Sequence, residues 1–273
     1  MAAVIEIDHL TFNYENGTPA LADLSLSVEP GETVVFIGPN GAGKTTLFLY
    51  ILGLLRQVPR DVSVLGRALT STQAVEAIRG RVGLVFQNPD DQLFCTTVFD
   101  DVAFGPINQG LAPAEVKDRV AQSLEAVGLT GYDHRVPHHL SGGEKRRVGL
   151  ATIFAMAPQV LLLDEPTSSL DPRGRREVIR LLKDFSGTKL VATHDFELAL
   201  EVATRVVLLH KGRLHADGPP LKILTDETLL KNSGLEMPLV LRYCVELRGR
   251  SGEQLSAISS QLSAKKKDKK ADC

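Results

Sequence analysis

One eight-residue pattern constrains this chain more than any other feature of its sequence. Residues 38–45 read Gly-Pro-Asn-Gly-Ala-Gly-Lys-Thr, which fits the phosphate-binding pattern G-x-x-x-x-G-K-[ST]. A β-branched apolar run at 33–37 precedes it, and a helix-forming segment follows. Glycines let such a loop curl so that its N–H groups face phosphate oxygens, and the helix start adds a positive dipole end. We therefore expect a buried strand, a phosphate loop and a helix, with Lys44 reaching the β and γ phosphates and Thr45 offering a hydroxyl to Mg²⁺.

A second apolar run supplies acidic partners for this loop. Residues 160–163 read Val-Leu-Leu-Leu and are followed by Asp164 and Glu165. Ligands of open α/β sheets bind at the carboxyl ends of the strands, so these two acids are expected beside the phosphate loop. There Asp164 would hold Mg²⁺ and Glu165 would orient and deprotonate the attacking water. Taken without the loop, the same pair would be two solvated acids at the end of a strand.

The order of the predicted elements indicates an α/β fold built on a mostly parallel sheet. Short, fully apolar runs alternate with longer helical periods after residue 33, as in such sheets. These runs are 34–37, 82–86, 160–163, 190–192 and 206–209. Residues 1–32 alternate around turn dipeptides and predict an N-terminal antiparallel β element. Residues of about 88–158 predict an inserted helical lobe, with helices near 98–104, 114–127 and 144–157.

The C-terminal quarter divides into three predicted parts. The main domain ends at about residue 225, after a turn and short strand at 211–218 and a helix that follows Pro219 and Pro220. Residues 226–262 form an extension, in which 226–248 are expected to make a helix and a strand. Residues 263–273 contain five lysines and two aspartates and are expected to be disordered. The residues before this basic tail carry a formal charge of −5, against −2 for the whole chain.

Composition excludes several classes of protein. With 43% hydrophobic and 23% charged residues, the chain has the make-up of a folded domain, and its charge balance does not favour a strongly basic nucleic-acid binder. No window approaches the roughly 18–20 apolar residues of a membrane span, and the acidic start is unlike a signal peptide. Three cysteines without a C-x-x-C pair argue against a disulfide framework or zinc knuckle. We expect the chain to remain in the cytosol.

Three further motifs favour one family among the many that share a phosphate loop. Residues 140–144 read Leu-Ser-Gly-Gly-Glu before a predicted helix, residues 166–171 read Pro-Thr-Ser-Ser-Leu-Asp, and His194 follows a short apolar strand. With the phosphate loop and the Asp164–Glu165 pair, these motifs stand in the order of the nucleotide-binding subunit of an ABC transporter. The chain resembles that family from residue 4 to about 220. The resemblance implies the ABC ATPase form of the P-loop NTPase fold for the domain 1–225.

The resemblance also implies a reaction and an assembly. Such subunits hydrolyse ATP with Mg²⁺ and pack head to tail as homodimers, so that the helix start at Ser141, Gly142 and Gly143 meets the γ-phosphate held by the other copy. A helix start without a lysine is a poor phosphate site when alone, which agrees with a shared site. Asp171 would then lie at the subunit interface.

Individual positions carry over by their match to the motifs. Gln87 matches the glutamine that senses Mg²⁺ and water, His194 the γ-phosphate switch histidine, and Tyr14 the aromatic that stacks on adenine. For Tyr14, packing at a sheet edge is the alternative. Glu144 stands where a glutamine is commonest. The nucleotide-binding set is completed by the loop and signature residues, which are Gly38, Asn40, Gly41, Gly43, Lys44, Thr45, Thr46, Ser141, Gly142 and Gly143.

The segment after Gln87 is similar to the ATPases of energy-coupling factor importers, and most of all to those of cobalt importers. Residues 87–94 read Gln-Asn-Pro-Asp-Asp-Gln-Leu-Phe, and 97–106 read Thr-Val-Phe-Asp-Asp-Val-Ala-Phe-Gly-Pro. This likeness implies integral membrane partners, a coupling protein and a substrate-binding component, with the chain at the cytoplasmic face of the cell membrane. Their coupling helices would enter a groove beside the glutamine loop. Candidates for its wall are Leu93, Phe94, Val98 and Phe99, unless these residues only pack the lobe.

Other cargoes and another class of protein remain as alternatives. Nickel importers are similar too, and a vitamin importer of the same class is a further possibility. A soluble ABC-type ATPase acting on DNA or ribosomes is the rival class, but such proteins generally need fused ATPase units, long coiled coils or zinc modules. His134, His138 and His139 suggest a metal site by their spacing, but Pro137 interrupts the helix face that such a site would use.

Overall fold

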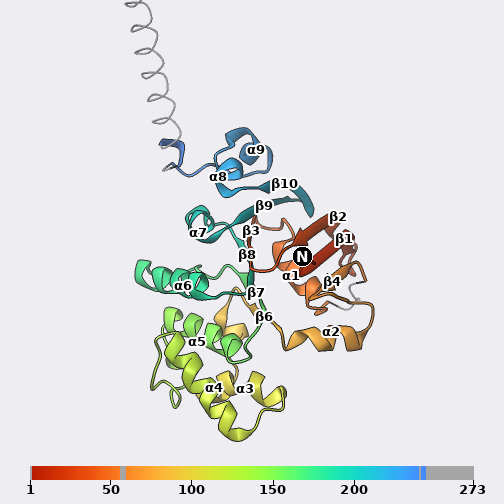
Figure 1. Ribbon diagram of the computed structural model, residues 1–273. Helices are drawn as coiled ribbons and strands as arrows, with labels where there is room; N and C mark the ends of the chain where they lie inside the picture. Colours follow the sequence, from red (N-terminus) through yellow and green to blue (C-terminus); the bar gives the residue numbers. More distant parts are fainter. Residues whose placement is uncertain (1, 56–59, 240, 244–273) are drawn as a thin grey trace, which may run out of the picture.

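The apolar runs form one central sheet, seen nearly edge-on in Figure 1. The computed structural model describes residues 2–55, 60–239 and 241–243. Within them the strands of this sheet are β3 (Thr33–Ile37), β6 (Val82–Val85), β7 (Val160–Asp164), β8 (Thr188–Thr193), β9 (Arg205–His210) and β10 (Arg213–Gly218). Their order is β10-β9-β3-β8-β7-β6, and every neighbouring pair is parallel except β9 with β10. The expected α/β fold with a mostly parallel sheet is confirmed.

Burial on both faces explains why these strands read as continuous apolar runs. Val35 and Ile37 of β3 lie in the core on one side of the sheet, whereas Val34 and Phe36 lie in the core on the other. Side chains alternate between the faces of a strand, so a sheet covered on both sides needs an apolar residue at every position. The register also brings the carboxyl ends of β3, β7 and β8 together, since Ile37 pairs with Thr193. The loops that follow these strands therefore meet at one edge.

The N-terminal antiparallel element is also confirmed, and it is larger than expected. It comprises β1 (Ile5–Asn13), β2 (Pro19–Val28), β4 (Val62–Val64) and β5 (Arg67–Ala68). These strands lie in the order β2-β1-β4-β5, all antiparallel. Helix α1 (Lys44–Ile51) buries Leu47, Phe48 and Ile51 in the core that this sheet shares with β3, and α2 (Thr72–Arg79) packs through Val75 and Ile78.

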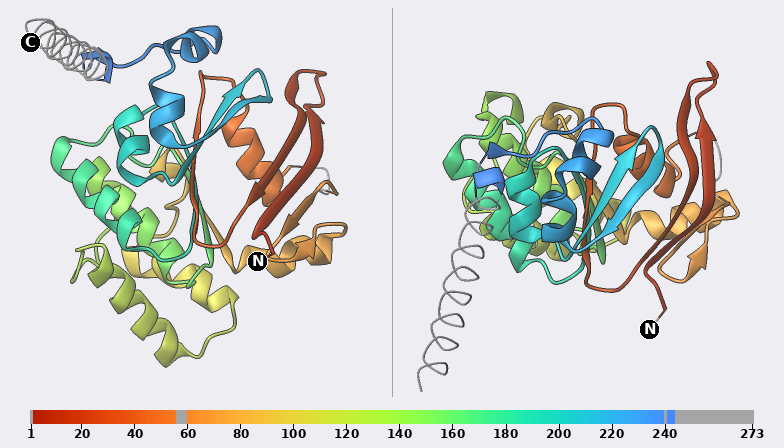
Figure 2. Two further views of the ribbon diagram at one scale, coloured as in Figure 1. Left: turned by 45° about the horizontal axis from the view of Figure 1, so that its top comes forward. Right: turned by 90° about the horizontal axis from the view of Figure 1, so that it is seen from above.

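The predicted helical lobe projects from one end of the central sheet (Figures 1 and 2). Its helices are α3 (Val98–Asn108), α4 (Pro113–Ala126) and α5 (Gly142–Phe154), with the 3₁₀ turns η1 (Pro89–Asp91) and η2 (Pro137–His139) in the connections. Each helix begins at a local signal. Thr97 and Ser141 cap α3 and α5 through their hydroxyls, and a proline opens α4.

The remaining helices cover the face of the sheet opposite α1 and continue its core (Figure 1). They are α6 (Pro172–Asp184), α7 (Phe196–Val202), α8 (Pro220–Leu224) and α9 (Glu227–Asn232). Leu230 and Met237 belong to the same buried cluster as α6 and α7, so the core extends past residue 225. Within the described helices, none combines the length and apolarity of a membrane span.

The strand expected within 226–248 is absent from the part of that range that the structure describes. After α9 the chain turns at Gly234, whose φ is +73°, runs irregularly to Pro238 and is helical at 239 and 241–243. Proline lacks the N–H that a sheet partner needs, which opposes a strand here. Residues 244–262 of the predicted extension and the predicted disordered tail 263–273 lie outside the described residues.

Candidate nucleotide site

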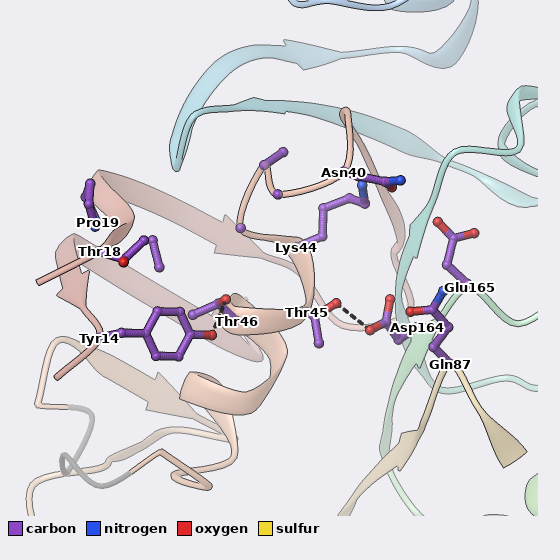
Figure 3. A pocket seen from close by; sticks show the side chains of 14 residues that line it. Tyr14, Thr18, Pro19, Asn40, Lys44, Thr45, Thr46, Gln87, Asp164 and Glu165 are labelled. Atoms are coloured by element: carbon purple, nitrogen blue, oxygen red, sulfur yellow. Dashed lines mark hydrogen bonds between the residues drawn. The ribbon is translucent and has the colours of Figure 1, made fainter. Parts of the chain in front are cut away.

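One cavity gathers most of the predicted nucleotide residues. Its volume is about 510 Å³, within the range of small-molecule sites. The loop before α1 forms one wall, and the ends of β6 and β7 form the other (Figure 3). The predicted residues that line it are Tyr14, Asn40, Gly41, Gly43, Lys44, Thr45, Thr46, Gln87, Asp164 and Glu165.

Two glycines of the loop are required by close backbone contacts. A Cβ at Gly38 would lie 2.2 Å from the carbonyl oxygen of Leu209. Gly43 has a φ of +103°, and a Cβ there would lie 2.6 Å from the carbonyl oxygen of Ala20. Gly38 is therefore not on the cavity wall but packs the loop against β9. Gly43 combines a close approach with a backbone conformation that other residues rarely adopt.

Lys44 lies inside the curve of the loop. Its Nζ donates to the carbonyl oxygens of Gly38, at 2.6 Å, and Pro39, at 3.2 Å. Burial lowers the pKa of the ammonium group, and the nearby carboxylates of Glu165 and Asp164 partly oppose that effect. A phosphate in the loop would add negative charge beside a cation whose hydrogen bonds within the described residues go to carbonyl oxygens alone, so the site is electrostatically suited to an anion.

Thr45 Oγ1 donates a hydrogen bond to Asp164 Oδ2 at 2.6 Å (Figure 3). Burial raises the pKa of the Asp164 carboxyl, and Glu165 adds to this, while the Thr45 hydrogen bond opposes it. Hydroxyl and carboxylate oxygens side by side are the donors that Mg²⁺ prefers. A buried carboxylate with a raised pKa also gains from a bound cation, so these residues fit the ion.

Glu165 is held at both carboxylate oxygens by the last residue of β8 and the residue that follows it. Thr193 Oγ1 donates to Glu165 Oε2 at 2.9 Å, and His194 Nδ1 lies 2.8 Å from Glu165 Oε1. The glutamate also has a φ of +47°, a strained conformation for a non-glycine residue that is typical of functional sites. His194 is therefore not on the cavity wall, but it contacts a residue that is. The contribution of Thr193 was not anticipated.

Gln87 reaches the cavity from the loop after β6, which an arginine of α5 holds in place. Arg146 is only 3% exposed, and its guanidinium donates to the carbonyl oxygens of Phe86 and Gln87. No motif marks this arginine in the sequence. One signal was present, because Arg146 lies one helical turn before Leu150, on the face that the lobe buries.

Tyr14 and the β1–β2 hairpin close the cavity on the side away from Glu165 (Figure 3). The Tyr14 hydroxyl lies 2.8 Å from Thr46 Oγ1, and the ring meets Phe12 edge-on. Its backbone N–H donates to the Thr18 carbonyl at 2.9 Å. That turn brings residues 18–20 to the wall, a contribution that was not expected although the turn dipeptide at 16–17 marked the hairpin. Stacking of Tyr14 on adenine stays a prediction.

Ser141, Gly142 and Gly143 line a different cavity, of about 530 Å³, together with Asp171. Ser141 caps α5, and Glu144 completes a capping box by accepting from the Ser141 backbone N–H. Asp171 caps α6 by accepting from the Gly174 N–H. The structure thus separates the predicted site residues into two groups.

Two of the four candidates for the groove wall follow the alternative, in which they pack the lobe. Leu93 and Val98 are buried in the lobe core, and Phe99 packs against that core. Phe94, in contrast, is 64% exposed and meets the exposed ring of Phe104 edge-on, with centroids 5.1 Å apart. Helical periodicity marks apolar residues without saying which of them face solvent, so the sequence could not separate the two sets. Ile107, one turn after Phe104, extends the exposed patch.

The three histidines of the lobe lie apart from the cavity. His134 is exposed, with Nε2 3.4 Å from Asp133 Oδ2, and η2 contains His138 and His139. Among the described residues no group of three or more His, Cys, Asp or Glu side chains is arranged to hold a metal ion.

Comparisons with known proteins agree with this geometry. The model of the family described as ABC transporter matches residues 21–168. The energy-coupling factor transporter ATP-binding protein EcfA of Methanothermobacter thermautotrophicus is 48% identical over 239 residues, which cover 86% of this chain and 77% of that protein. Among solved structures, CbiO1 of Clostridium perfringens, described as part of the ABC transporter complex CbiONQ, is 32% identical and aligns with a TM-score of 0.75, covering 89% of this chain and 99% of that one. The ATP-binding cassette MJ0796, solved as a post-hydrolysis dimer with ADP and Pi, is 26% identical with a TM-score of 0.72, covering 79% and 98% of the two chains.

Proposed function

We propose that this chain is the ATP-hydrolysing subunit of a multi-subunit importer. The chain belongs to the ABC transporter family, and within that family to the ATP-binding proteins of energy-coupling factor transporters. It is an ATPase of the ABC family. The cargo that we propose is a transition metal ion, with cobalt as first candidate because residues 87–94 and 97–106 are most similar to the ATPases of cobalt importers. Nickel or a vitamin would be carried by the same machinery. The rival, a soluble ABC-type ATPase acting on DNA or ribosomes, has no supporting feature in the described residues.

The observation that carries the proposal is the separation of the site into two cavities. Lys44, Thr45, Asp164 and Glu165 line one of them, and the Ser141 helix start lines the other, so a nucleotide held by the first is not enclosed by the second. Two copies packed head to tail would complete two sites from four half-sites. Such an assembly is supported by the dimeric cassette among the similar structures.

Within one half-site the residues divide the work of phosphate cleavage. Lys44 and the loop N–H groups bind the β and γ phosphates, while Thr45, Asp164 and Gln87 would hold Mg²⁺. When bound, the ion would neutralise charge that builds up on the phosphate oxygens. Glu165 orients the attacking water and accepts its proton at a carboxylate oxygen. Thr193 and His194 each contact one of these oxygens in the single chain, and each oxygen keeps a second lone pair that can accept a hydrogen bond from the water.

The first test separates dimerisation from hydrolysis. Glu165→Gln keeps the size of the side chain but removes the base, so we expect ATP to drive dimerisation while turnover falls at least about a hundredfold. Size-exclusion chromatography with light scattering measures the dimer, and phosphate release measures turnover. Normal hydrolysis by this variant would exclude Glu165 as the base, and failure to dimerise with ATP would argue against the shared site.

The second test addresses membrane partners and cargo. We propose that the chain binds at the cytoplasmic face of the cell membrane, where the exposed Phe94, Phe104 and Ile107 side chains offer an apolar contact for a coupling protein. Copurification from detergent with small multi-spanning subunits would support this, and ATPase activity that never associates with a membrane protein would refute it. Uptake of labelled Co²⁺ and Ni²⁺ by the reconstituted complex would then decide between the cargoes.

A further inference from the structure

Arg175 lies on α6, one turn after the helix cap Asp171, and contacts three carboxylates of the segment that follows β8. Its Nε donates to Asp195 Oδ2 at 3.1 Å and its Nη2 to Asp195 Oδ1 at 3.4 Å. A further nitrogen, Nη1, donates to Glu201 Oε1 at 3.1 Å, and Nη2 lies 3.6 Å from Glu197 Oε2. The side chain is only about a fifth exposed. Two contacts to one carboxylate fix the direction of that carboxylate as well as its distance.

Asp195 joins this arginine to the residues that hold Glu165. It accepts from the Thr167 hydroxyl at 3.3 Å and from the Leu198 N–H at 2.9 Å, capping α7. Its own N–H donates at 3.0 Å to Thr193 Oγ1, the hydroxyl that in turn donates to Glu165. Residues 193–195 therefore form one turn with two sets of contacts. Thr193 and His194 contact Glu165, and Asp195 contacts Arg175.

Arg175 compensates the negative charge of three carboxylates at and after this turn. Asp195, Glu197 and Glu201 lie around its guanidinium, and the only other cation that the structure shows on any of them within the described residues is Lys183, 3.5 Å from Glu201. Burial would raise the pKa of the Asp195 carboxyl, but hydrogen bonds from Arg175, Leu198 and Thr167 lower it below its ordinary value. Without the arginine, the half-buried Asp195 carboxylate would lose its two guanidinium contacts and lie near two further acids, of which only Glu201 keeps a cation, Lys183.

We propose that Arg175 is a positioning residue for hydrolysis, which fixes the Thr193–Asp195 turn so that Thr193 and His194 hold Glu165 in its working orientation. The roles of Glu165 and His194 rest on the proposed function. Arg175 itself does not line the nucleotide cavity, and the residues that would bind the nucleotide lie on other elements. Its loss therefore acts on turnover and leaves nucleotide binding in place.

Arg175→Met tests the proposal, with Lys183→Met as the matched control. Lys183 is a cation on the same helix that pairs with Glu201 but not with Asp195. We expect kcat to fall about tenfold or more in the Arg175 variant, since small misplacements of catalytic groups have such effects, with KM for ATP changed less than about twofold. Arg175→Lys keeps the charge without the fork and should recover part of the rate. Equal kcat values in the two methionine variants would overturn the proposal.

Asp195→Asn removes the ion pair between Arg175 and Asp195 by changing its other member. Asparagine still caps a helix, so α7 keeps its start while the charge pair is lost. We expect the double variant with Arg175→Met to be no slower than the worse single variant, because both remove one interaction. Multiplied losses would show that the two residues act independently and would refute the link.

The ring signals of His194, assigned in isotope-labelled protein with the help of a His194→Gln variant, give a readout that does not depend on hydrolysis. They should shift in Arg175→Met and stay in place in Lys183→Met. If Glu165→Gln still hydrolyses ATP, the proposed base is wrong, but the His194 signals still test the positioning. Unchanged signals in Arg175→Met overturn the positioning and leave the proposed base intact.

Discussion

Replacing Glu144 by the glutamine that is commonest at this place in the family should destabilise this particular chain. The Glu144 carboxylate accepts three hydrogen bonds. The Tyr132 hydroxyl donates to Oε1 at 2.7 Å, and the backbone N–H and hydroxyl of Ser141 both donate to Oε2 at 2.8 Å. A glutamine has one acceptor oxygen, and its amide group would present N–H bonds to one of these donors. At least one charge-assisted hydrogen bond is therefore lost or reversed in Glu144→Gln.

The structure sets the size of the effect. Hydrogen bonds from Tyr132 and Ser141 lower the pKa of Glu144 to about 2, from an ordinary value of 4.5. A dry carboxyl with that difference would contribute roughly 3 kcal/mol to folding at neutral pH. Solvent reaches this side chain, and helix caps of this kind contribute about 1 kcal/mol when measured. We expect Glu144→Gln to lower the free energy of unfolding by about 1–2 kcal/mol, and Tm by roughly 2–6 °C.

The pH dependence identifies the cause. Because the folded-state pKa is the lower one, the contribution of Glu144 is fully present above pH 4.5 and is lost as the pH falls toward 2. Glutamine does not titrate, so the stability gap between the variants should narrow by about half near pH 3. Urea unfolding between neutral pH and the lowest pH at which both variants fold measures this gap.

A matched control removes the same charge elsewhere on the lobe. Glu125 on α4 is exposed, and its side chain has no hydrogen bond or ion pair in the described structure, so Glu125→Gln should leave stability unchanged. A Glu144→Gln variant as stable as the parent at neutral pH would refute the reasoning. A gap that does not narrow in acid would instead assign the loss to packing.

Three further changes test other parts of the structure. Lys44→Ala removes the only cation on the cavity wall within the described residues. Because a charge-assisted contact to phosphate is lost, ATP binding should weaken by at least about tenfold in calorimetry. Unchanged affinity would contradict the proposed site. Gly38→Ala places a Cβ 2.2 Å from the Leu209 carbonyl and should cost about 1–3 kcal/mol in urea unfolding; parental stability would mean that the loop has another way to pack. Phe94→Asp and Phe104→Asp should each leave the ATPase rate of the isolated chain unchanged but reduce copurification with membrane subunits. Full copurification of both variants would show that the patch is not part of the proposed contact.

Much of the fold could be predicted because the central sheet is covered on both faces. A continuous apolar run such as 160–163 indicates a strand buried on both sides when helical periods precede and follow it, and the three lobe helices carried recognisable starts. Strands β4 and β5 escaped prediction because three and two residues are too few to show a period. No strand lies in the described part of 226–248, because apolar side chains there, such as Met237, are buried in irregular structure.

The site shows the same division between local signal and long-range contact. The phosphate loop and the Asp164–Glu165 pair each follow a buried strand, and parallel pairing brings such strand ends together whatever the details of packing. The contacts that hold Glu165 and the loop of Gln87 could not be predicted in this way, because Thr193, Arg146 and Arg175 belong to no recognisable motif. Their roles depend on which helix lies beside which loop, and that is decided by the whole core.

Two of these unpredicted residues, Arg146 and Arg175, play the same structural part, since each links the start of a helix to a loop. Ser141 caps α5 and Asp171 caps α6, and both caps are among the residues that line the second cavity. Within five residues of its cap, each helix carries an arginine that reaches a loop of the proposed catalytic site: Arg146 binds the carbonyl of Gln87, and Arg175 binds Asp195 next to His194. Both contacts are short and largely shielded from water, so a helix start cannot shift far without moving its loop. If a second copy docks on the two helix starts, we therefore expect it to act on the proposed water-activating residues of this copy, through two side chains that do not line the nucleotide cavity in the described structure.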